Sequence, residues 1–292
     1  MKLSWAQAFE NWTRKHKHQR RRTPALSSIQ NLEQRTLLTV STLFANNELT
    51  VVVDEGNDSI SLGTSPANPS LIELTVNTVV DTSLPPIAAA DVGSVVIIGS
   101  DGANSIDLSG ITTAAFTFTD PVSGNPLQIL VDAGNGDDTL IASSGFNDTL
   151  QGGHGNDILG PSPAASATAV TTFDGGDGAD IINGSFADDI LIGGDGDDLI
   201  TGNAGNDDIS GGNGEDRIDG SSGNDTISAG QGADIVTGGT GDDSISGDDG
   251  NDSLLGEDGN DTLRGGIRDD TLDGGFGDDS LAGEGGSDSL SG

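Results

Sequence analysis

Several residue types are scarce in this chain of 292 residues, and each scarcity removes a class of function. There is no cysteine, which excludes disulfides and a cysteine nucleophile. None of the three histidines lies in an HExxH zinc motif. His16, His18 and His154 show no partner pattern for a catalytic triad. No apolar run is long enough for a transmembrane helix. We therefore expect neither catalysis nor a membrane-spanning segment.

Basic residues are also few, and they are concentrated at one end. The sequence has 11 Lys and Arg against 47 Asp and Glu, a net charge of −36, yet eight of the 11 lie within residues 1–40. We predict a basic, targeting-like segment there. Trp5, Phe9 and Trp12 share a helical face, so an amphipathic helix at a membrane surface is one option. The strongly acidic remainder argues against a nucleic-acid partner.

The end of this segment carries a short motif. NLEQRTLLT, from Asn31 to Thr39, resembles the LExRxLL segment found near the N-termini of many large secreted and surface proteins of planctomycete bacteria. The following stretch, LLTVSTLFA at residues 37–45, is either a weak export signal or the first strand. The resemblance implies a secreted or cell-surface protein.

Glycine and aspartate, by contrast, are abundant and lie in a fixed frame. From Gly175 to Ser291 a nine-residue unit recurs thirteen times without insertion or deletion. The first position is Gly except at Ala229, the fourth is Gly except at Ala187 and Arg268, and the eighth is always Ile, Leu or Val. The sixth position is always aspartate: Asp180, Asp189, Asp198, Asp207, Asp216, Asp225, Asp234, Asp243, Asp252, Asp261, Asp270, Asp279 and Asp288.

These residue types suit a turn that binds a cation. Glycine permits the positive φ angles of a tight turn and leaves carbonyl oxygens free to face an ion. The sixth-position carboxylate adds a charged oxygen. Ligands that are all oxygen favour a hard cation, and the variable coordination of calcium suits a loop better than the strict octahedron of magnesium. The eighth residue would point inward from a short strand, so that two units form one coil of about eighteen residues.

The unit resembles G-G-x-G-x-D-x-U-x, the RTX or hemolysin-type calcium-binding nonapeptide repeat. The resemblance implies an all-β fold, a right-handed parallel β-roll (β-solenoid), in which turn carbonyls and the aspartates bind Ca²⁺. Seven turns would lie on one edge and six on the other. If each ion sits between consecutive turns of one edge, the array holds up to about eleven calcium ions.

Charge predicts that the array folds only on binding calcium. Residues 175–291 hold 29 Asp and Glu against three Arg, and stacked carboxylates repel one another without a cation. The alternative is a disordered, acidic, glycine-rich linker. The fixed frame disfavours the linker. Arg268 replaces a turn glycine beside the ion, so we predict that the site using this turn is weak or empty.

The repeat begins earlier, with interruptions. Residues 133–160 hold three more units, with Ala142 as an extra residue, and add Asp138, Asp148 and Asp157 as predicted ligands. The segment 161–174 then interrupts the frame, as a looped excursion or as a strand followed by a turn. The uninterrupted roll covers residues 175–292. His154, at a variable turn position, is expected to be exposed.

Residues 41–132 are all-β in pattern but lack the strict frame. Their β-branched runs end in Gly, Asn and Asp turns, and the phrases GNDSISL and GANSIDL resemble worn versions of the later unit. We interpret this region as an irregular β-helical or β-sandwich cap. A carbohydrate-binding domain is disfavoured, because Phe116 and Phe118 are a single aromatic pair without Tyr or Trp.

Together these features favour a calcium-binding, secreted or cell-surface structural or adhesion module. Its partners would be calcium ions and cell-surface or extracellular matrix components. The alternative is an RTX toxin-related or other exported protein whose effector domain lies elsewhere. A hydrolase housed in residues 41–132 is a weaker third hypothesis.

Overall fold

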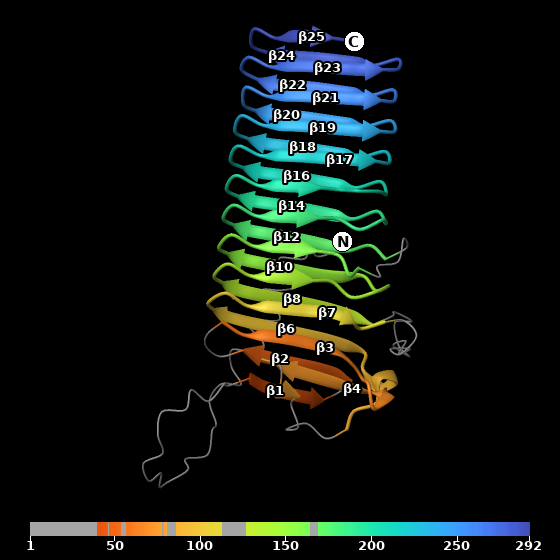
Figure 1. Ribbon diagram of the computed structural model, residues 1–292. Helices are drawn as coiled ribbons and strands as arrows, with labels where there is room; N and C mark the ends of the chain where they lie inside the picture. The colour runs from red at the N-terminus through yellow and green to blue at the C-terminus, as the bar shows by residue number, and fades with distance from the viewer. Residues whose placement is uncertain are drawn as a thin grey trace, which may run out of the picture. The chain divides into compact units, whose positions relative to one another are not determined.

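The chain divides into two compact units, residues 1–37 and 38–292. The computed structural model describes residues 40–45, 47–53, 57–77, 79–80, 86–112, 127–163 and 169–292, all of which belong to the second unit. The basic segment, the LExRxLL motif and the pair Phe116 and Phe118 lie outside the described residues. The second unit is a β-solenoid in which two long sheets face one another (Figure 1).

From β5 onward, strands alternate between the two sheets along the chain. The 12-stranded sheet contains, in order, β1 (Val40–Ala45), β2 (Glu48–Val53), β6 (Ser94–Asp101), β8 (Gln128–Asn135), β10 (Asp148–His154), β12 (Thr172–Asp177), β14 (Ile190–Asp195), β16 (Asp208–Asn213), β18 (Thr226–Gln231), β20 (Ser244–Asp249), β22 (Thr262–Ile267) and β24 (Ser280–Gly285). The 13-stranded sheet contains β5 (Val79–Val80), β4 (Asn68–Val76), β3 (Ser59–Ser65), β7 (Ser105–Gly110), β9 (Thr139–Ile141), β11 (Ile158–Gly160), β13 (Ile181–Asn183), β15 (Leu199–Thr201), β17 (Arg217–Ser222), β19 (Ile235–Thr240), β21 (Ser253–Asp258), β23 (Thr271–Phe276) and β25 (Ser289–Ser291).

The nonapeptide frame sets the register of the ladder. From β12 onward every strand pairs in parallel with the strand two elements later, and each residue faces the one eighteen positions on, as Leu191 faces Ile209. Two nonapeptides therefore make one coil, as predicted. We call the turns that lead from the 12-stranded to the 13-stranded sheet the forward edge, and the turns that lead back the return edge.

Departures from the eighteen-residue coil fall on the return edge. Between β8 and β10 the coil spacing is nineteen residues, since Ile129 faces Asp148. Between β10 and β12 it is twenty-three, since Thr149 faces Thr172. Strand pairing therefore resumes with β12 at Thr172, three residues before Gly175, where the strict nonapeptide frame begins. The forward edge keeps turns of constant length from β6 onward.

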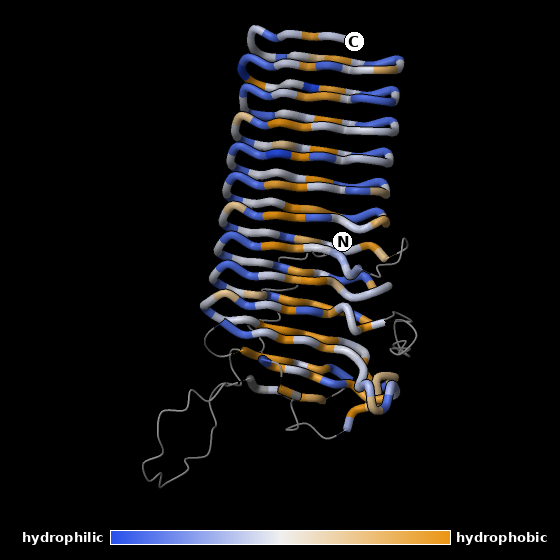
Figure 2. The backbone as a smooth tube through the Cα atoms, viewed as in Figure 1, coloured by the Kyte–Doolittle hydropathy of each residue, from blue (hydrophilic) through white to orange (hydrophobic). Residues whose placement is uncertain are grey.

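The core of the repeat region is formed by apolar side chains that point inward from both sheets, one from each nonapeptide. The eighth-position residues from Ile182 to Leu272 are at most 2% exposed. Strands of the repeat point the eighth position and the following first position inward, and the first position is glycine except at Ala229. Figure 2 shows hydrophobic residues along the strands and hydrophilic ones at the turns. The core therefore gains little beyond one side chain per repeat.

The region before residue 128 continues the same two sheets. Strands β2, β6 and β8 pair in parallel, as do β3, β7 and β9, so these strands extend the two sheets of the repeat region. At the N-terminal end of the ladder, β1 pairs antiparallel with β2, and β4 pairs antiparallel with β3 and β5. A 3-10 helix, η1 (Ala89–Asp91), precedes β6. Apolar residues such as Val95, Ile97 and Leu108 fill this part of the core, and β6 and β7 each bury more than one of them.

Helices contribute little to this part of the chain. Within the residues that the structure describes, no helix is long and apolar enough to cross a membrane.

Candidate metal centres in the turns

A row of buried polar side chains runs along the forward edge. Each member's backbone N–H donates to a side-chain oxygen of the next member, one coil further on, over 2.6–3.4 Å. The row consists of Asp58, Asn104, Asp138, Asp157, Asp180, Asp198, Asp216, Asp234, Asp252, Asp270 and Asp288. Nine predicted ligands therefore lie in one line.

The return edge carries a second, shorter row. Its N–H to carboxylate bonds begin at Thr171 and continue through Asp189, Asp207, Asp225, Asp243, Asp261 and Asp279, over 2.7–2.9 Å. Asp148 lies on the same edge, two coils before Asp189. Residues 175–291 thus place seven sixth-position aspartates on the forward edge and six on the return edge, which is the predicted division.

Only one carboxylate oxygen of most members is hydrogen-bonded. Oδ1 accepts the ladder bond, whereas the buried Oδ2 accepts no hydrogen bond within the described residues. This holds for Asp138, Asp157, Asp180, Asp198, Asp207, Asp216, Asp225, Asp234, Asp243, Asp252, Asp261, Asp270 and Asp279. A buried acceptor without a partner costs about 1–3 kcal/mol, and more when it is charged, so these oxygens call for a positively charged partner.

Backbone carbonyl oxygens surround the same space. A β-carbon placed on the first-position Gly193 would overlap Oδ2 of Asp198 and lie 2.5 Å from the carbonyl oxygen of Gly211, one coil further on. Glycine is therefore required at this position, and two acceptors from adjacent coils face one space. Acceptors that converge in this way repel one another unless a cation lies between them.

Burial raises the pKa of these carboxyl groups. Desolvation, opposed by the ladder hydrogen bond and reinforced by neighbouring carboxylates, raises the pKa of Asp198 and of Asp207 to about 7 and that of Asp216 to about 6. The ionised form of these carboxyl groups is thus held in an unfavourable environment. A bound cation would reverse this, because an opposite charge favours the ionised form.

The donor set fits calcium. Within the described residues no three His, Cys, Asp or Glu side chains converge on one point, so carboxylates alone do not build a site. One carboxylate per turn together with backbone carbonyls gives an all-oxygen set, which calcium accepts in flexible numbers. Zinc and copper sites would require nitrogen or sulfur ligands.

The turn conformation depends on the fourth position. Gly196 has φ +133° and Gly214 has φ +141°, a region open in practice only to glycine. Arg268 adopts φ +90° at the equivalent position, and its Nε lies 3.1 Å from Oδ1 of Asp249 on an exposed surface. The guanidinium group therefore pairs with the preceding coil of the edge. Whether its site binds weakly stays a prediction.

Asp148 and Asp189 differ from the other predicted ligands. Oδ2 of Asp148 accepts a hydrogen bond from the Ser143 N–H at 2.6 Å, and its Oδ1 accepts one from the Ser143 hydroxyl. Oδ2 of Asp189 accepts one from the Ser185 N–H at 2.6 Å. In both turns a serine precedes the aspartate where the regular repeat has glycine. In these two turns a serine N–H thus donates to Oδ2, the oxygen that has no hydrogen-bond partner in thirteen other turns of the described residues.

A third feature, a set of exposed hydrogen bonds along both edges, was not predicted from the sequence. Fifth-position side chains accept hydrogen bonds from the backbone N–H one coil later; the acceptors are Asn57, Asp137, Asn156, Asp188, Asp197, Asn206, Asn224, Asp242, Asn251, Asn260 and Asp269. The excess of Asn and Asp at this position was the available signal. Asp58 and Asn104 were also missed as members of the buried row.

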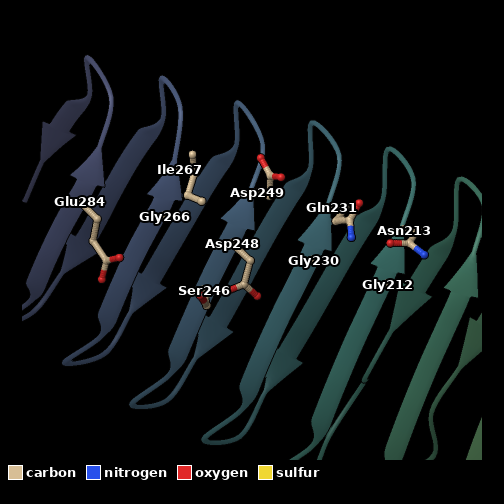
Figure 3. Close-up of a pocket in the computed structure, with 10 residues that line it drawn as sticks. All are labelled: Gly212, Asn213, Gly230, Gln231, Ser246, Asp248, Asp249, Gly266, Ile267 and Glu284. Atoms are coloured by element: carbon tan, nitrogen blue, oxygen red, sulfur yellow. Dashed lines mark hydrogen bonds between the residues drawn. The ribbon is translucent and has the colours of Figure 1, made fainter.

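Two shallow depressions lie on the outside of the forward edge. One is lined by Asn213, Gln231, Asp248, Asp249 and Glu284 among others (Figure 3), and the second by Asp197, Glu215 and Arg268 among others. Neither is lined by a member of the buried rows. His154 lies on the same surface, as expected, with Nδ1 2.6 Å from Oδ2 of Asp177.

Comparison with known families identifies the repeat. The family model for the RTX calcium-binding nonapeptide repeat matches residues 132–160, 174–209, 201–236, 210–245, 228–263 and 264–292. These matches span more than half of the chain, and the chain belongs to this family. No curated protein matches it. The β-roll and the two buried rows are thus those of a calcium-binding repeat protein.

Proposed function

We propose that this protein is a secreted or cell-surface β-roll that folds on binding calcium and serves as a structural or adhesion module. The single observation that carries the proposal is that, among the described residues, thirteen buried carboxylate oxygens in the two rows have no hydrogen-bond partner. In turns such as those of Asp198 and Asp207, the oxygen lies close to a backbone carbonyl of the adjacent coil, and calcium between them would join successive turns.

Folding on binding is supported by the balance of charge and core. Residues 175–291 carry a net charge of −26 by formal count, and their repeats bury little more than one apolar side chain each. Hydrophobic burial is therefore small for the number of residues ordered, while ionised carboxylates oppose stacking. Calcium binding would supply the missing free energy, as in other proteins whose metal sites form only in the folded state.

An extracellular location is supported by the kind of site. Oxygen sites of extracellular modules bind calcium with Kd values of about 0.1–1 mM. Because the sequence has no cysteine, disulfides cannot stabilise the protein outside the cell, and calcium would take that role. We propose a non-catalytic role, since the buried carboxylates lie in rows against backbone oxygens and line neither depression. Cell-surface or matrix components are the proposed partners.

The ligand assignment is tested with a pair of variants of the full chain. Asp198→Asn removes the orphaned carboxylate, whereas Asp197→Asn changes the adjacent exposed residue, whose Oδ1 accepts the Glu215 N–H. Equilibrium dialysis should give at least one calcium ion fewer for Asp198→Asn and the parent count for Asp197→Asn. Equal counts for both variants would refute the assignment. The forward-edge and return-edge aspartates with orphaned oxygens, together with Asp288, are the proposed ligands; Asp148 and Asp189 would contribute less.

The adhesion role has its own test. Labelled protein is incubated with cells or extracellular matrix in calcium and in chelator. Retention only in calcium supports the role. Equal retention in both conditions, or none in either, contradicts it.

A further inference from the structure

Asn104 occupies the place of a metal-binding aspartate in the forward row. It is 2% exposed, its Oδ1 accepts the Asp58 N–H and its N–H donates to Oδ1 of Asp138. It thus makes the two ladder bonds that the aspartates make. It differs from them in one atom, because a side-chain nitrogen stands where they have Oδ2.

That nitrogen is surrounded by carbonyl oxygens. Nδ2 of Asn104 lies 2.9 Å from the carbonyl oxygen of Gly102, 3.3 Å from that of Ala133 and 3.4 Å from that of Ser100. Ser100 lies at the end of β6 and Gly102 in the turn that follows, whereas Ala133 lies in β8, one coil further on. Three acceptors from two coils therefore converge on one buried donor.

The same place in the following turns holds an orphaned acceptor. Ser100 faces Gly134 and Gly134 faces Gly153 in register, so the carbonyl positions recur coil by coil. At the next coils Asp138 and Asp157 present a partnerless Oδ2. A β-carbon on Gly152 would overlap Oδ2 of Asp157 and lie 2.7 Å from the Gly175 carbonyl oxygen. Backbone carbonyls thus face a side-chain N–H donor at Asn104, whereas the equivalent carbonyls of later coils face a carboxylate oxygen.

We propose that the Asn104 side-chain amide takes the place of calcium between its turn and the next, and closes this part of the roll without metal. The inference rests on the proposed calcium binding of the regular turns. An amide has donors for the converging carbonyls and carries no charge that burial would penalise. The amide nitrogen binds the carbonyl oxygens that an ion would bind, and, unlike an ion, it is part of the chain and does not dissociate.

A metal-independent start of the roll follows from this assignment. The coil around Asn104 also has the larger core, with Val95, Ile97, Ile106 and Leu108 at most 1% exposed. Strands β6 to β9 therefore stack by apolar packing and protein hydrogen bonds. They would form in chelator and present a template on which the calcium-dependent coils add.

Asn104→Asp converts the place into a regular turn and tests the proposal. The carboxylate can still accept the Asp58 N–H, but its second oxygen faces the three carbonyls. Equilibrium dialysis of the full chain should give one more bound calcium ion than the parent. Asn156→Asp is the matched control, since Asn156 is exposed and its Oδ1 accepts the Ala179 N–H at 2.8 Å, which a carboxylate also accepts. It should bind the parent number.

Each outcome is decisive. An Asn104→Asp protein that is folded in calcium and binds the parent number overturns the proposal. A parent that binds no calcium refutes the proposed function instead.

Hydrogen exchange of the unaltered protein in chelator gives a measurement that needs no variant. Slow exchange in residues 94–110 and 127–141, together with fast exchange in residues 196–216, supports the proposal. Fast exchange in both regions overturns it. Slow exchange in both contradicts calcium-dependent folding.

Discussion

The fourth-position glycines provide the sharpest prediction about the turns, and Gly196→Ala is the change that tests it. Gly196 has φ +133°, a conformation that costs a residue with a β-carbon about 1–3 kcal/mol. The new β-carbon would also overlap the carbonyl oxygen of Gly178. Gly178 is held in turn, because its N–H donates to the Asp195 carbonyl at 2.6 Å, so the turn cannot relax locally.

The expected magnitude combines these two effects. Overpacking costs about 1–3 kcal/mol in addition to the backbone strain, which gives a loss of about 3 kcal/mol or more. Such a loss lowers the ratio of folded to unfolded protein about 100-fold. Since the same turn carries the proposed ligand Asp198, the calcium concentration at the folding midpoint should rise as well.

Gly160→Ala is the matched control. Gly160 lies in β11, and a β-carbon there would meet nothing within 4 Å. Alanine at an unstrained position stabilises by about 0.4–1 kcal/mol, because it restricts the unfolded chain. Urea unfolding in saturating calcium should therefore move in opposite directions for the two variants. Similar unfolding free energies would refute the reasoning about the turn.

Three further predictions follow from the ladder. Ile200→Ala truncates a fully buried eighth-position side chain and should lower the free energy of unfolding by about 2–5 kcal/mol. Leu199→Ala, at a position 42% exposed, should change it by about 0.5 kcal/mol or less. Equal losses of the two variants in urea unfolding would contradict the inward orientation of the eighth position. Arg268→Gly should raise bound calcium in equilibrium dialysis, because it removes a positive charge and a residue with φ +90°; an unchanged count would show that the turn already binds normally. In chelator, β structure measured by circular dichroism should be greatest near pH 4 and decrease as the pH rises through about 6–7. Burial raises the pKa of ladder carboxyls such as Asp198 to about 7, and a group whose pKa is raised in the folded state stabilises the fold only while it is protonated. β structure that increases with pH would contradict this sign.

Much of the ladder could be predicted from the sequence because the frame is strict. A period of nine with one inward residue fixes both the eighteen-residue register and the alternation of turns between two edges. The glycine and aspartate positions then determine which groups meet in each turn. The structure has the same pairing, as with Ile190 and Asp208.

What could not be predicted depends on single turns. Asn104 sits in GANSIDL, where the aspartate of the consensus is replaced, and only the register shows that it belongs to the same row. The N–H groups of Ser143 and Ser185 turn toward aspartates because of local backbone angles, which the residue names do not specify. The insertions on the return edge could be located but their effect on register could not, since loop length alone does not fix where a strand resumes.

The most direct test of the account is a calcium titration of the full chain, followed by circular dichroism, with magnesium as the control. The account predicts a cooperative gain of β structure near millimolar calcium, with little response to magnesium. A chain whose repeat region is already folded in chelator at neutral pH would contradict it, because the partnerless carboxylates would then be tolerated without a cation. A chain that stays unfolded in both ions would contradict it equally.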